Sequence, residues 1–298
     1  MHYWLFTGIG TLAVFGLSAC SFRRRGFSLA VPLWSFVLSC ALGTVCSKVF
    51  YVLLKAIEDL IDFGPEVFLE TRPSTFSFFG GCVGVFLAVW AASGITHTSR
   101  EEVLDIFSLY GAALVAVWRG GEYFLGTLGA GPFLDSGFPL NFPPFVISNG
   151  YGESFFALPL MEILSALVLI PVFFRYRGKR AGLRFETVIF YLALPQIIWE
   201  SMRLQCMKWG FVRIEQLLCA LLVWFLVWRC CHLGRDAQPS RVRRYLPFAL
   251  ILICAAIVAG MEFALDKTGL GFTMSYLIMA LSLVGMGWLR ERAYREIR

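Results

Sequence analysis

Long apolar runs separated by short polar segments dominate the chain. A helix of about 20 apolar residues crosses the hydrocarbon core of a bilayer, so runs of this length are typical of membrane-spanning helices. We expect nine such helices, of which the fourth and sixth are short, at residues 3–21, 29–54, 75–95, 104–119, 155–174, 185–199, 214–229, 246–265 and 271–289. The fold class predicted is an all-α polytopic membrane protein with about nine transmembrane helices.

One connection, at about 120–154, is much longer than the others. It contains four prolines and several aromatic residues. Aromatic side chains favour the depth of the lipid headgroups. We therefore expect this connection to form a structured cap in the outer interface.

The basic residues alternate between the two ends of the predicted helices. Most of the 26 Lys and Arg lie on one set of connections, at residues 23–25, 100, 175–184, 229–244 and 290–298. Cytoplasmic connections of membrane proteins carry an excess of Lys and Arg. We therefore expect the N-terminus outside and the C-terminus in the cytoplasm.

The composition agrees with the membrane assignment. Hydrophobic residues make up 58% of the 298 residues, charged residues make up 15%, and the mean hydropathy is +0.71. A soluble domain cannot bury that much apolar surface. Basic connections facing an anionic leaflet explain the net charge of +6, so no nucleic-acid partner is predicted.

Nine cysteines are scattered along the chain without a CxxC pair, which favours small apolar packing residues over a metal site. Residues 17–20, LSAC, are similar to the lipobox of secreted lipoproteins. In a signal peptide, positive charge precedes the apolar core, whereas here it follows at residues 23–25. We therefore expect the first helix to be retained and Cys20 to stay unmodified.

Ionisable residues within or at the ends of the predicted helices are the first functional candidates, because each costs about 2.5–3.5 kcal/mol at the bilayer centre. They are Lys48, Arg119, Glu122, Glu162, Glu200 and Arg203, with Glu215 and Glu262 nearer helix ends. Lys48 has the alternative of extending its ammonium to the interface. Glu200 and Arg203 have the alternative of an interfacial ion pair on one helix face. Glu162 has no basic neighbour in sequence, so it requires a partner.

The strongest local signal is WRGGEYFLG at residues 118–126, directly after the fourth apolar run. Gly120 and Gly121 allow either close approach of another backbone or a break in the helix, and N–H groups freed by a break beside Arg119 form an anion site. A guanidinium donates two parallel hydrogen bonds to a phosphate, so this stretch predicts a phosphate site. Glu122 keeps a second interpretation open, in which it neutralises Arg119 as a structural pair.

A second glycine cluster, Gly80, Gly81 and Gly84, opens the third helix. Small residues at this spacing usually indicate close packing of membrane helices. Taken alone, the cluster favours a packing role.

Taken in order, these features resemble the prolipoprotein diacylglyceryl transferase family. Lys48 stands three residues before Tyr51, where the family has a glycine-alanine-arginine run leading to a tyrosine. Gly80 and Gly81 match two glycines of the third helix, but Phe79 replaces the histidine that precedes them in the family.

The loop after the fourth helix matches the family's GRxGNFxNGE pattern in part. Arg119, Gly121 and Gly126 match, whereas Glu122 stands where asparagine is expected. At the start of the fifth helix, Glu162 matches the glutamate of a tyrosine-glutamate pair.

The last motif is the family's RFxxExFR pattern. Glu200 and Arg203 match it, and Gln196 replaces its first arginine. Gly210 and the residues around Gln216 are similar to the glycine-then-GQ segment that follows. The resemblance covers about residues 30–230, and the two C-terminal helices are additional.

The resemblance implies an enzyme of the bacterial cytoplasmic membrane that moves the diacylglyceryl group of phosphatidylglycerol onto a lipobox cysteine thiol. Its partners would be phosphatidylglycerol, or a similar anionic phospholipid, and a prolipoprotein signal peptide, with no cofactor. Carried over residue by residue, it implies that Arg119 and Arg203 hold the phosphate and that Glu122 is the nearest replacement for the missing base. The substrate-binding residues it implies are Lys48, Tyr51, Gly80, Gly81, Gly121, Glu162, Gln196 and Glu200.

The resemblance also divides the chain into a transferase-like domain of seven helices (1–230), a basic cytoplasmic linker (231–245) and two additional helices with a basic tail (246–298). Two other functional classes stay open. One is a non-catalytic membrane protein of the same fold that binds a lipid or escorts a lipoprotein. The other is a transporter, since helices interrupted by glycines and charges suit transporters as well, although the sequence has no inverted repeat.

Overall fold

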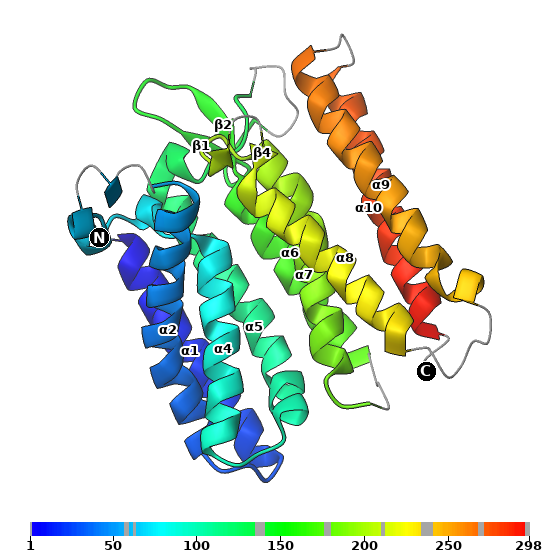
Figure 1. Cartoon of the computed structure of the whole chain (residues 1–298). Helices are drawn as coiled ribbons and strands as arrows, with labels where there is room; N and C mark the ends of the chain where they lie inside the picture. Colours follow the sequence, from blue (N-terminus) through cyan, green and yellow to red (C-terminus); the bar gives the residue numbers. More distant parts are fainter. Residues whose placement is uncertain are drawn as a thin grey trace. The chain divides into compact units, whose positions relative to one another are not determined.

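The computed structural model describes residues 2–56, 60–61, 64–134, 141–175, 180–209, 212–233, 241–267 and 271–295. Nine long helices account for most of these described residues (Figure 1). They are α1 (His2–Arg24), α2 (Ala30–Leu54), α4 (Phe78–Ile95), α5 (Arg100–Glu122), α6 (Leu158–Arg175), α7 (Leu183–Met202), α8 (Ile214–Leu233), α9 (Arg241–Lys267) and α10 (Phe272–Arg295). Each lies at one of the nine predicted positions, with ends that differ by a few residues.

Within the described residues, seven of these helices are long and apolar enough to cross a membrane. The other two are α6, in which the apolar stretch counted among the described residues is the shorter Leu158–Pro171, and α7, which contains Pro195 and several polar residues. The predicted all-α polytopic membrane protein is therefore confirmed. Which side each terminus faces stays a prediction.

The chain forms two compact units. The first comprises Met1–Val188 and Met202–Ile214, and the second comprises Ile189–Ser201 and Glu215–Arg298. The division of the sequence into residues 1–230, 231–245 and 246–298 stays a proposal, and residues 234–240 of its basic linker lie outside the described part.

Close approach of small residues joins α2 to α4 in the first unit. A Cβ atom added at Gly80 would lie 2.7 Å from both the Cys46 carbonyl oxygen and the Phe50 Cβ. One added at Gly84 would collide with the backbone of Leu42 and Gly43. Membrane helices lack a hydrophobic drive to associate and pack through such contacts, which supports the packing interpretation of this glycine cluster. Further packing joins α5 to α1 and to α6.

The long connection is structured within its described residues, while its place in the outer interface stays a prediction. A 3-10 helix, η3 (Tyr123–Leu128), leads to the antiparallel pair β1 (Val146–Ser148) and β2 (Ser154–Phe156). Ala130, Ile147 and Ala157 form a small apolar core beneath them. The Ala130 carbonyl accepts a hydrogen bond of 3.1 Å from the N–H of Leu204, which ties the cap to the segment after α7.

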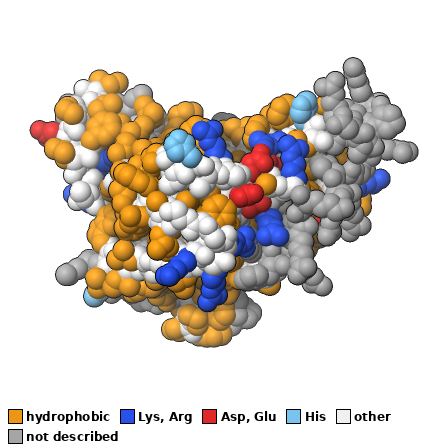
Figure 2. All heavy atoms as spheres, turned by 90° about the horizontal axis from the view of Figure 1, so that it is seen from below, with side chains coloured by type: hydrophobic (Ala, Val, Ile, Leu, Met, Phe, Trp, Pro, Cys, Tyr) orange, Lys and Arg blue, Asp and Glu red, His pale blue; other side chains and the backbone are white. Residues whose placement is uncertain are grey.

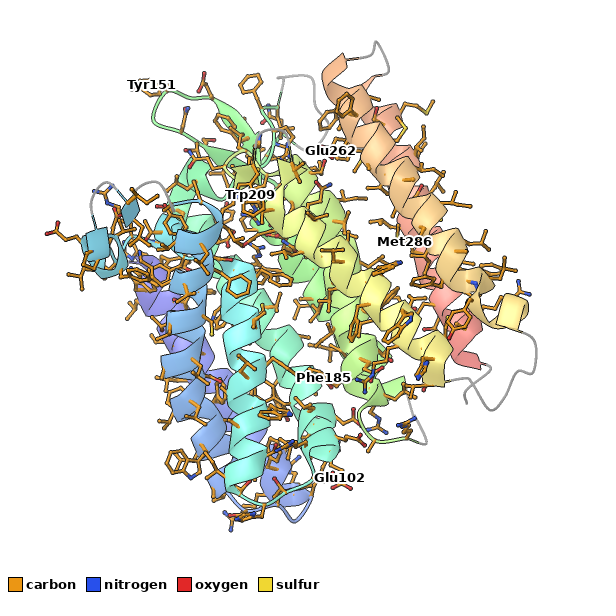
Figure 3. All side chains as sticks on the ribbon, in the orientation of Figure 1. Glu102, Tyr151, Phe185, Trp209, Glu262 and Met286 are labelled. Carbon is orange, nitrogen blue, oxygen red and sulfur yellow. The ribbon has the colours of Figure 1, made fainter. Side chains whose placement is uncertain are left out.

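A second short hairpin follows α7, with strands β3 (Lys208–Trp209) and β4 (Val212–Arg213). Gly210, part of the glycine-then-GQ segment, lies outside the described residues. Tyr151 and Trp209 are exposed aromatic side chains of the two hairpins and lie toward one end of the first unit, while Glu102 lies at the other (Figure 3).

The end of the first unit opposite the hairpins is basic. Figure 2 looks onto the end at which α1 ends and α5 begins, and Lys and Arg side chains lie across the middle of this face. Arg23 and Arg24 occupy the last turn of α1, and the Arg100 guanidinium lies 4.1 Å from the centre of the Trp90 ring. This gathering of positive charge is what the alternating pattern predicts at one end of the helices.

The second unit is held partly by polar contacts between its helices. The Ser201 hydroxyl on α7 donates a short hydrogen bond to Glu262 on α9 and lies 3.0 Å from the Tyr276 hydroxyl on α10. The Gln216 amide on α8 donates to the same carboxylate of Glu262 over 3.3 Å. Hydrogen bonds between side chains support association of helices in a bilayer, so this cluster ties α9 and α10 to the helices before them.

Candidate functional site

Four charged side chains converge in the first unit, and we call them the charge quartet. Arg119 and Glu122 lie near the C-terminal end of α5, Glu162 lies near the start of α6, and Arg203 directly follows α7. Arg119 and Glu162 are almost completely buried, whereas Glu122 exposes 15% of its side chain. Their segments are far apart in the sequence and meet only in the folded chain.

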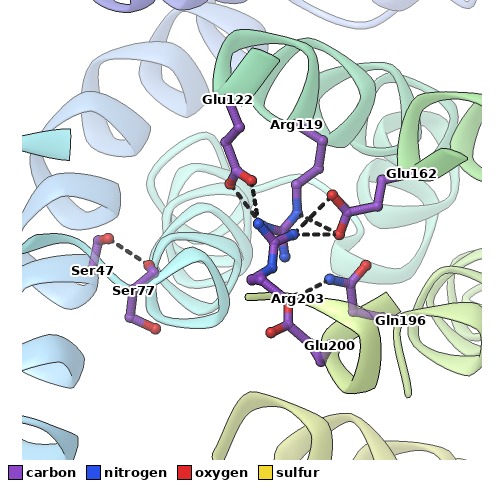
Figure 4. Close-up of polar contacts among 8 residues, drawn as sticks. All are labelled: Ser47, Ser77, Arg119, Glu122, Glu162, Gln196, Glu200 and Arg203. Atoms are coloured by element: carbon purple, nitrogen blue, oxygen red, sulfur yellow. Dashed lines mark hydrogen bonds and ion pairs between the residues drawn. The ribbon is translucent and has the colours of Figure 1, made fainter. Parts of the chain in front are cut away.

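The four side chains form a closed ring of ion pairs (Figure 4). Glu122 bridges the two arginines, with Oε1 at 2.7 Å from Arg119 Nη1 and Oε2 at 2.6 Å from Arg203 Nη1. Glu162 accepts two hydrogen bonds from Arg203 Nη2, at 2.7 and 2.8 Å. Its Oε1 also lies 3.3 Å from Arg119 Nε, which closes the ring.

The ring of ion pairs explains how four charged side chains can be buried together. An unpaired buried charge is strongly destabilising, while a pair with good geometry and satisfied hydrogen bonds offsets its desolvation. The two arginines and two glutamates sum to zero formal charge. The Arg119 guanidinium also lies 3.6 Å from the centre of the Phe78 ring, a cation–π contact that adds an apolar partner.

The expected helix break at Gly120 and Gly121 is wrong. Helix α5 continues through both residues to Glu122, and the backbone departs from helical geometry only at Gly126, where φ is 61°. A helix leaves carbonyl groups unpaired at its C-terminal end, and its free N–H groups lie at the other end. The Arg119 side chain, rather than freed N–H groups, is therefore the candidate anion-binding element of this stretch, and its role stays a prediction.

Gly121 is required for packing. A Cβ atom there would collide with Thr7 Cγ2 and would lie 3.2 Å from the Tyr3 ring on α1. This contact presses the start of α1 against the end of α5 beside the charge quartet.

A cavity of about 490 Å³ opens among α1, α2, α4 and α5. Apolar and aromatic side chains form most of its wall, together with hydroxyl groups such as those of Thr11, Thr44 and Ser47. Among the described residues that line it, Glu122 alone is charged. The mostly apolar cavity therefore reaches one edge of the charge quartet, at Glu122.

Most residues of the cavity wall were not candidates from the sequence, and two of them lie beside the charge quartet. Tyr3 lines the cavity together with Glu122. Phe78 forms part of the wall, and its ring also makes the cation–π contact with the Arg119 guanidinium. The sequence offered one signal for Tyr3, which is the polar hydroxyl it adds at the start of the first apolar run. Nothing in the sequence distinguished Phe78 from its aromatic neighbours.

Lys48 is buried and held by the loop that precedes α4. Its ammonium donates to the Glu70 carbonyl over 2.7 Å and to the Thr75 hydroxyl over 2.8 Å. The ammonium also lies 5.4 Å from the centre of the Tyr51 ring and 4.9 Å from that of Phe76. These contacts direct the ammonium toward the loop between α2 and α4, and the alternative in which Lys48 extends to the interface stays open. Binding of substrate by Lys48 and Tyr51 stays a prediction.

The two glycines of α4 have different surroundings. Gly81 lines the cavity, and Gly80 packs against α2. The Ser47 hydroxyl on α2 donates to the Ser77 carbonyl at the start of α4, which fixes the two helices beside the cavity (Figure 4). Their roles in substrate binding stay predictions.

Gln196 and Glu200 belong to the second unit. Both are buried on α7, and the Gln196 amide donates to the Glu200 carboxylate over 2.8 Å. Gln196, which stands where the resemblance expects an arginine, thus serves as a neutral partner of Glu200. Substrate binding by Gln196 and Glu200, which the resemblance implies, stays a prediction.

The chain has three histidines, and all are exposed. His2 lies at the start of α1, His97 follows α4, and the His232 ring stacks on Trp228 near the end of α8. Phe79, at the position of the family's histidine, lies 6.3 Å from the Phe50 ring, measured between ring centres. None of the three histidines lines the cavity, and Glu122 is the charged residue that does so among the described residues.

Comparison with known proteins agrees with the geometry. The family model described as prolipoprotein diacylglyceryl transferase matches residues 1–231. Three relatives are phosphatidylglycerol–prolipoprotein diacylglyceryl transferases from three strains of Clostridium botulinum. Each is 22% identical over 206 residues, which cover 68% of this chain and 79% of the relative. The chain therefore belongs to the prolipoprotein diacylglyceryl transferase family.

Proposed function

We propose that this chain transfers the diacylglyceryl group of phosphatidylglycerol, or of a similar anionic phospholipid, to the cysteine thiol in the lipobox of a prolipoprotein. In this reaction the bond between the glyceryl carbon and the phosphate oxygen breaks, and a carbon–sulfur bond forms. Glycerol phosphate leaves. One observation carries the proposal: two buried arginines meet on the carboxylate of Glu122, which lines a mostly apolar cavity, in a chain of this family.

The arginines supply what the departing phosphate requires. Negative charge grows on the phosphate oxygens as the carbon–oxygen bond breaks, and fixed donors in a site that excludes water stabilise such charge strongly. A guanidinium suits the task because it donates two parallel hydrogen bonds. Arg119 and Arg203 point at the same carboxylate from different segments, so one anion can contact both.

The cavity supplies a place for the lipid tails. Its wall comes largely from apolar residues of α1, α2 and α4, while Glu122 lies at its charged edge. A phospholipid lying in it with its tails among these helices would bring its phosphate to the arginines. Gly81 lies in the wall of this space. Substrate binding by the other residues that the resemblance implies is proposed on that resemblance alone, and they are Lys48, Tyr51, Gly80, Gly121, Glu162, Gln196 and Glu200.

The sulfur attacks as a thiolate, so the reaction requires a proton acceptor. Glu122 is proposed for this role, because it is the charged residue that faces the cavity.

A second function has a specific observation in its favour. The charge quartet is neutral without any ligand, and Phe79 and Gln196 replace two of the family's polar residues. A protein with these features that binds the lipid or the lipoprotein without transfer would be a non-catalytic member of the fold.

Complementation separates the two functions. A bacterium depleted of its own diacylglyceryl transferase is supplied with this chain, or with Arg119→Ala or Gly16→Ala. We expect growth and lipidated lipoproteins with the wild type and Gly16→Ala, whose added methyl group meets nothing within 4 Å, and neither with Arg119→Ala. Expression of a membrane-inserted wild type without growth would support the non-catalytic function.

A further inference from the structure

The carboxylate of Glu122 occupies the place between the two arginines. Each of its oxygens contacts a different guanidinium, at 2.7 Å from Arg119 Nη1 and 2.6 Å from Arg203 Nη1 (Figure 4). A phosphodiester likewise has two non-ester oxygens that share one negative charge, and it would be held in the same way. The carboxylate and a lipid phosphate therefore need the same two donors.

The other carboxylate of the quartet is held more firmly. Glu162 contacts Arg203 through both of its oxygens and also lies 3.3 Å from Arg119 Nε. Its side chain is 1% exposed, against 15% for Glu122. Glu122 lines the cavity, whereas Glu162 does not. An anion that enters from the cavity meets Glu122 first and can displace it while the Glu162 contacts remain.

We infer that lipid phosphate and the Glu122 carboxylate exchange places on the two arginines, so that binding of the lipid releases Glu122 as the base for the thiol. The inference rests on the proposed function, because it takes the entering anion to be the phosphodiester of the lipid substrate. It adds a coupling: the base becomes available only when the group to be transferred is present.

The exchange conserves the ion pairs of the two arginines. One singly charged anion replaces another on the arginines, so the number of ion pairs there is unchanged. The released carboxylate moves into a cavity with mostly apolar walls, where an ionised group without a cation is costly and takes up a proton readily. The exchange thus turns Glu122 from a carboxylate paired with two guanidinium groups into a proton acceptor.

The chemical step then balances. The thiol gives its proton to Glu122, and the sulfur forms a bond to the terminal glyceryl carbon of the lipid. The bond from that carbon to the phosphate oxygen breaks, and the oxygen keeps the electron pair. Glu122 returns the proton to the departing glycerol phosphate and closes again on Arg119 and Arg203.

Substituting Glu122 tests the exchange with the full-length purified chain. Binding is measured with phosphatidylglycerol in nanodiscs, and transfer with a lipobox peptide. In Glu122→Gln the phosphate no longer competes with a charged group, so we expect about ten- to a hundredfold tighter binding together with loss of transfer. Glu70→Gln is the matched control, because it removes a carboxylate from an exposed ion pair with Arg72 and should change neither quantity.

Glu122→Asp provides a second variant if the amide fails to fold. Its carboxylate is one methylene shorter and cannot reach both guanidinium groups, so we expect tighter lipid binding with partial retention of transfer. A merely structural role would weaken binding in both variants. Unchanged or weaker binding in the variant that folds would overturn the exchange.

The two proposals fail in different ways. If the wild type transfers lipid but Glu122→Gln binds it no more tightly, the proposed function stands and the exchange is wrong. If Glu122→Gln binds more tightly while the wild type transfers nothing, the arginines bind phosphate as inferred and the proposed transfer is wrong.

Discussion

At the scale of single residues, the site is defined by charges that satisfy one another. Arg119 touches two carboxylates and the face of Phe78, and Arg203 holds the same two carboxylates from another segment. The cost of charge in hydrocarbon was enough to select all four members of the quartet from the sequence. It could not show that they are mutual partners, because Glu162 and Arg203 belong to different helices and segments.

Arg119→Lys should reduce lipid binding and transfer nearly as much as Arg119→Ala. Lysine presents a compact charge and cannot make the forked contacts to Glu122 and Glu162 together with stacking on Phe78. Losing a hydrogen bond to a charged group costs about 1.5–3 kcal/mol, so affinity for phosphatidylglycerol should fall by roughly ten- to a hundredfold. Arg72→Lys is the control, since the Arg72 side chain is 80% exposed. Affinity in Arg119→Lys equal to that of the wild type would end the phosphate-site interpretation.

Lys48→Met should lower thermal stability. Methionine fills a similar volume but loses the donors that hold the Glu70 carbonyl and the Thr75 hydroxyl, at about 1.5–3 kcal/mol for bonds from a charged group. Lys55→Met, at an exposed position at the end of the same helix, should have little effect. A variant that keeps its melting temperature but loses lipid affinity would show instead that Lys48 binds substrate.

At the scale of elements, the lengths of the apolar runs predicted where the helices lie. The neighbours of individual glycines determined where the helices pack closely and whether they continue. Helices extend beyond the runs because polar ends such as Arg24 and Glu122 remain helical outside the most apolar stretch. The sequence suggested a break at Gly120 and Gly121, whereas Thr7 and Tyr3 of α1 require the missing side chain of Gly121 within a continuous helix. A glycine that bends the chain and one that admits a neighbour look identical in sequence.

Gly80→Ala should destabilise the fold if this glycine is needed for close packing of α4 against α2. Its new methyl group would lie 2.7 Å from a backbone oxygen of α2, and overpacking of this kind costs about 1–3 kcal/mol. Gly16→Ala, in the middle of α1 with nothing within 4 Å of the added atom, should be neutral or stabilising by up to about 1 kcal/mol. Thermal unfolding in detergent measures both, and equal melting temperatures for the two variants would contradict the packing role of Gly80.

At the scale of the whole molecule, the chain joins a family domain to two helices that the family match does not include. The match ends at residue 231, and α9 and α10 follow. Glu262 on α9 accepts hydrogen bonds from Ser201 on α7 and Gln216 on α8, so the added helices are tied by polar contacts to helices within the matched part. Apolar periodicity predicted that these helices exist. Apolar periodicity could not predict that Ser201 and Glu262 are in contact, because it does not determine which helices of a bundle are neighbours.

The central claim is transfer of lipid to a thiol, and one measurement tests it most directly. The purified full-length chain is incubated with phosphatidylglycerol and a lipobox peptide, and the products are analysed by mass spectrometry. We expect a diacylglyceryl adduct on the peptide cysteine and glycerol phosphate in equal amount, with neither formed by Arg119→Ala. A folded wild-type chain that binds phosphatidylglycerol yet leaves the peptide unmodified would contradict the account.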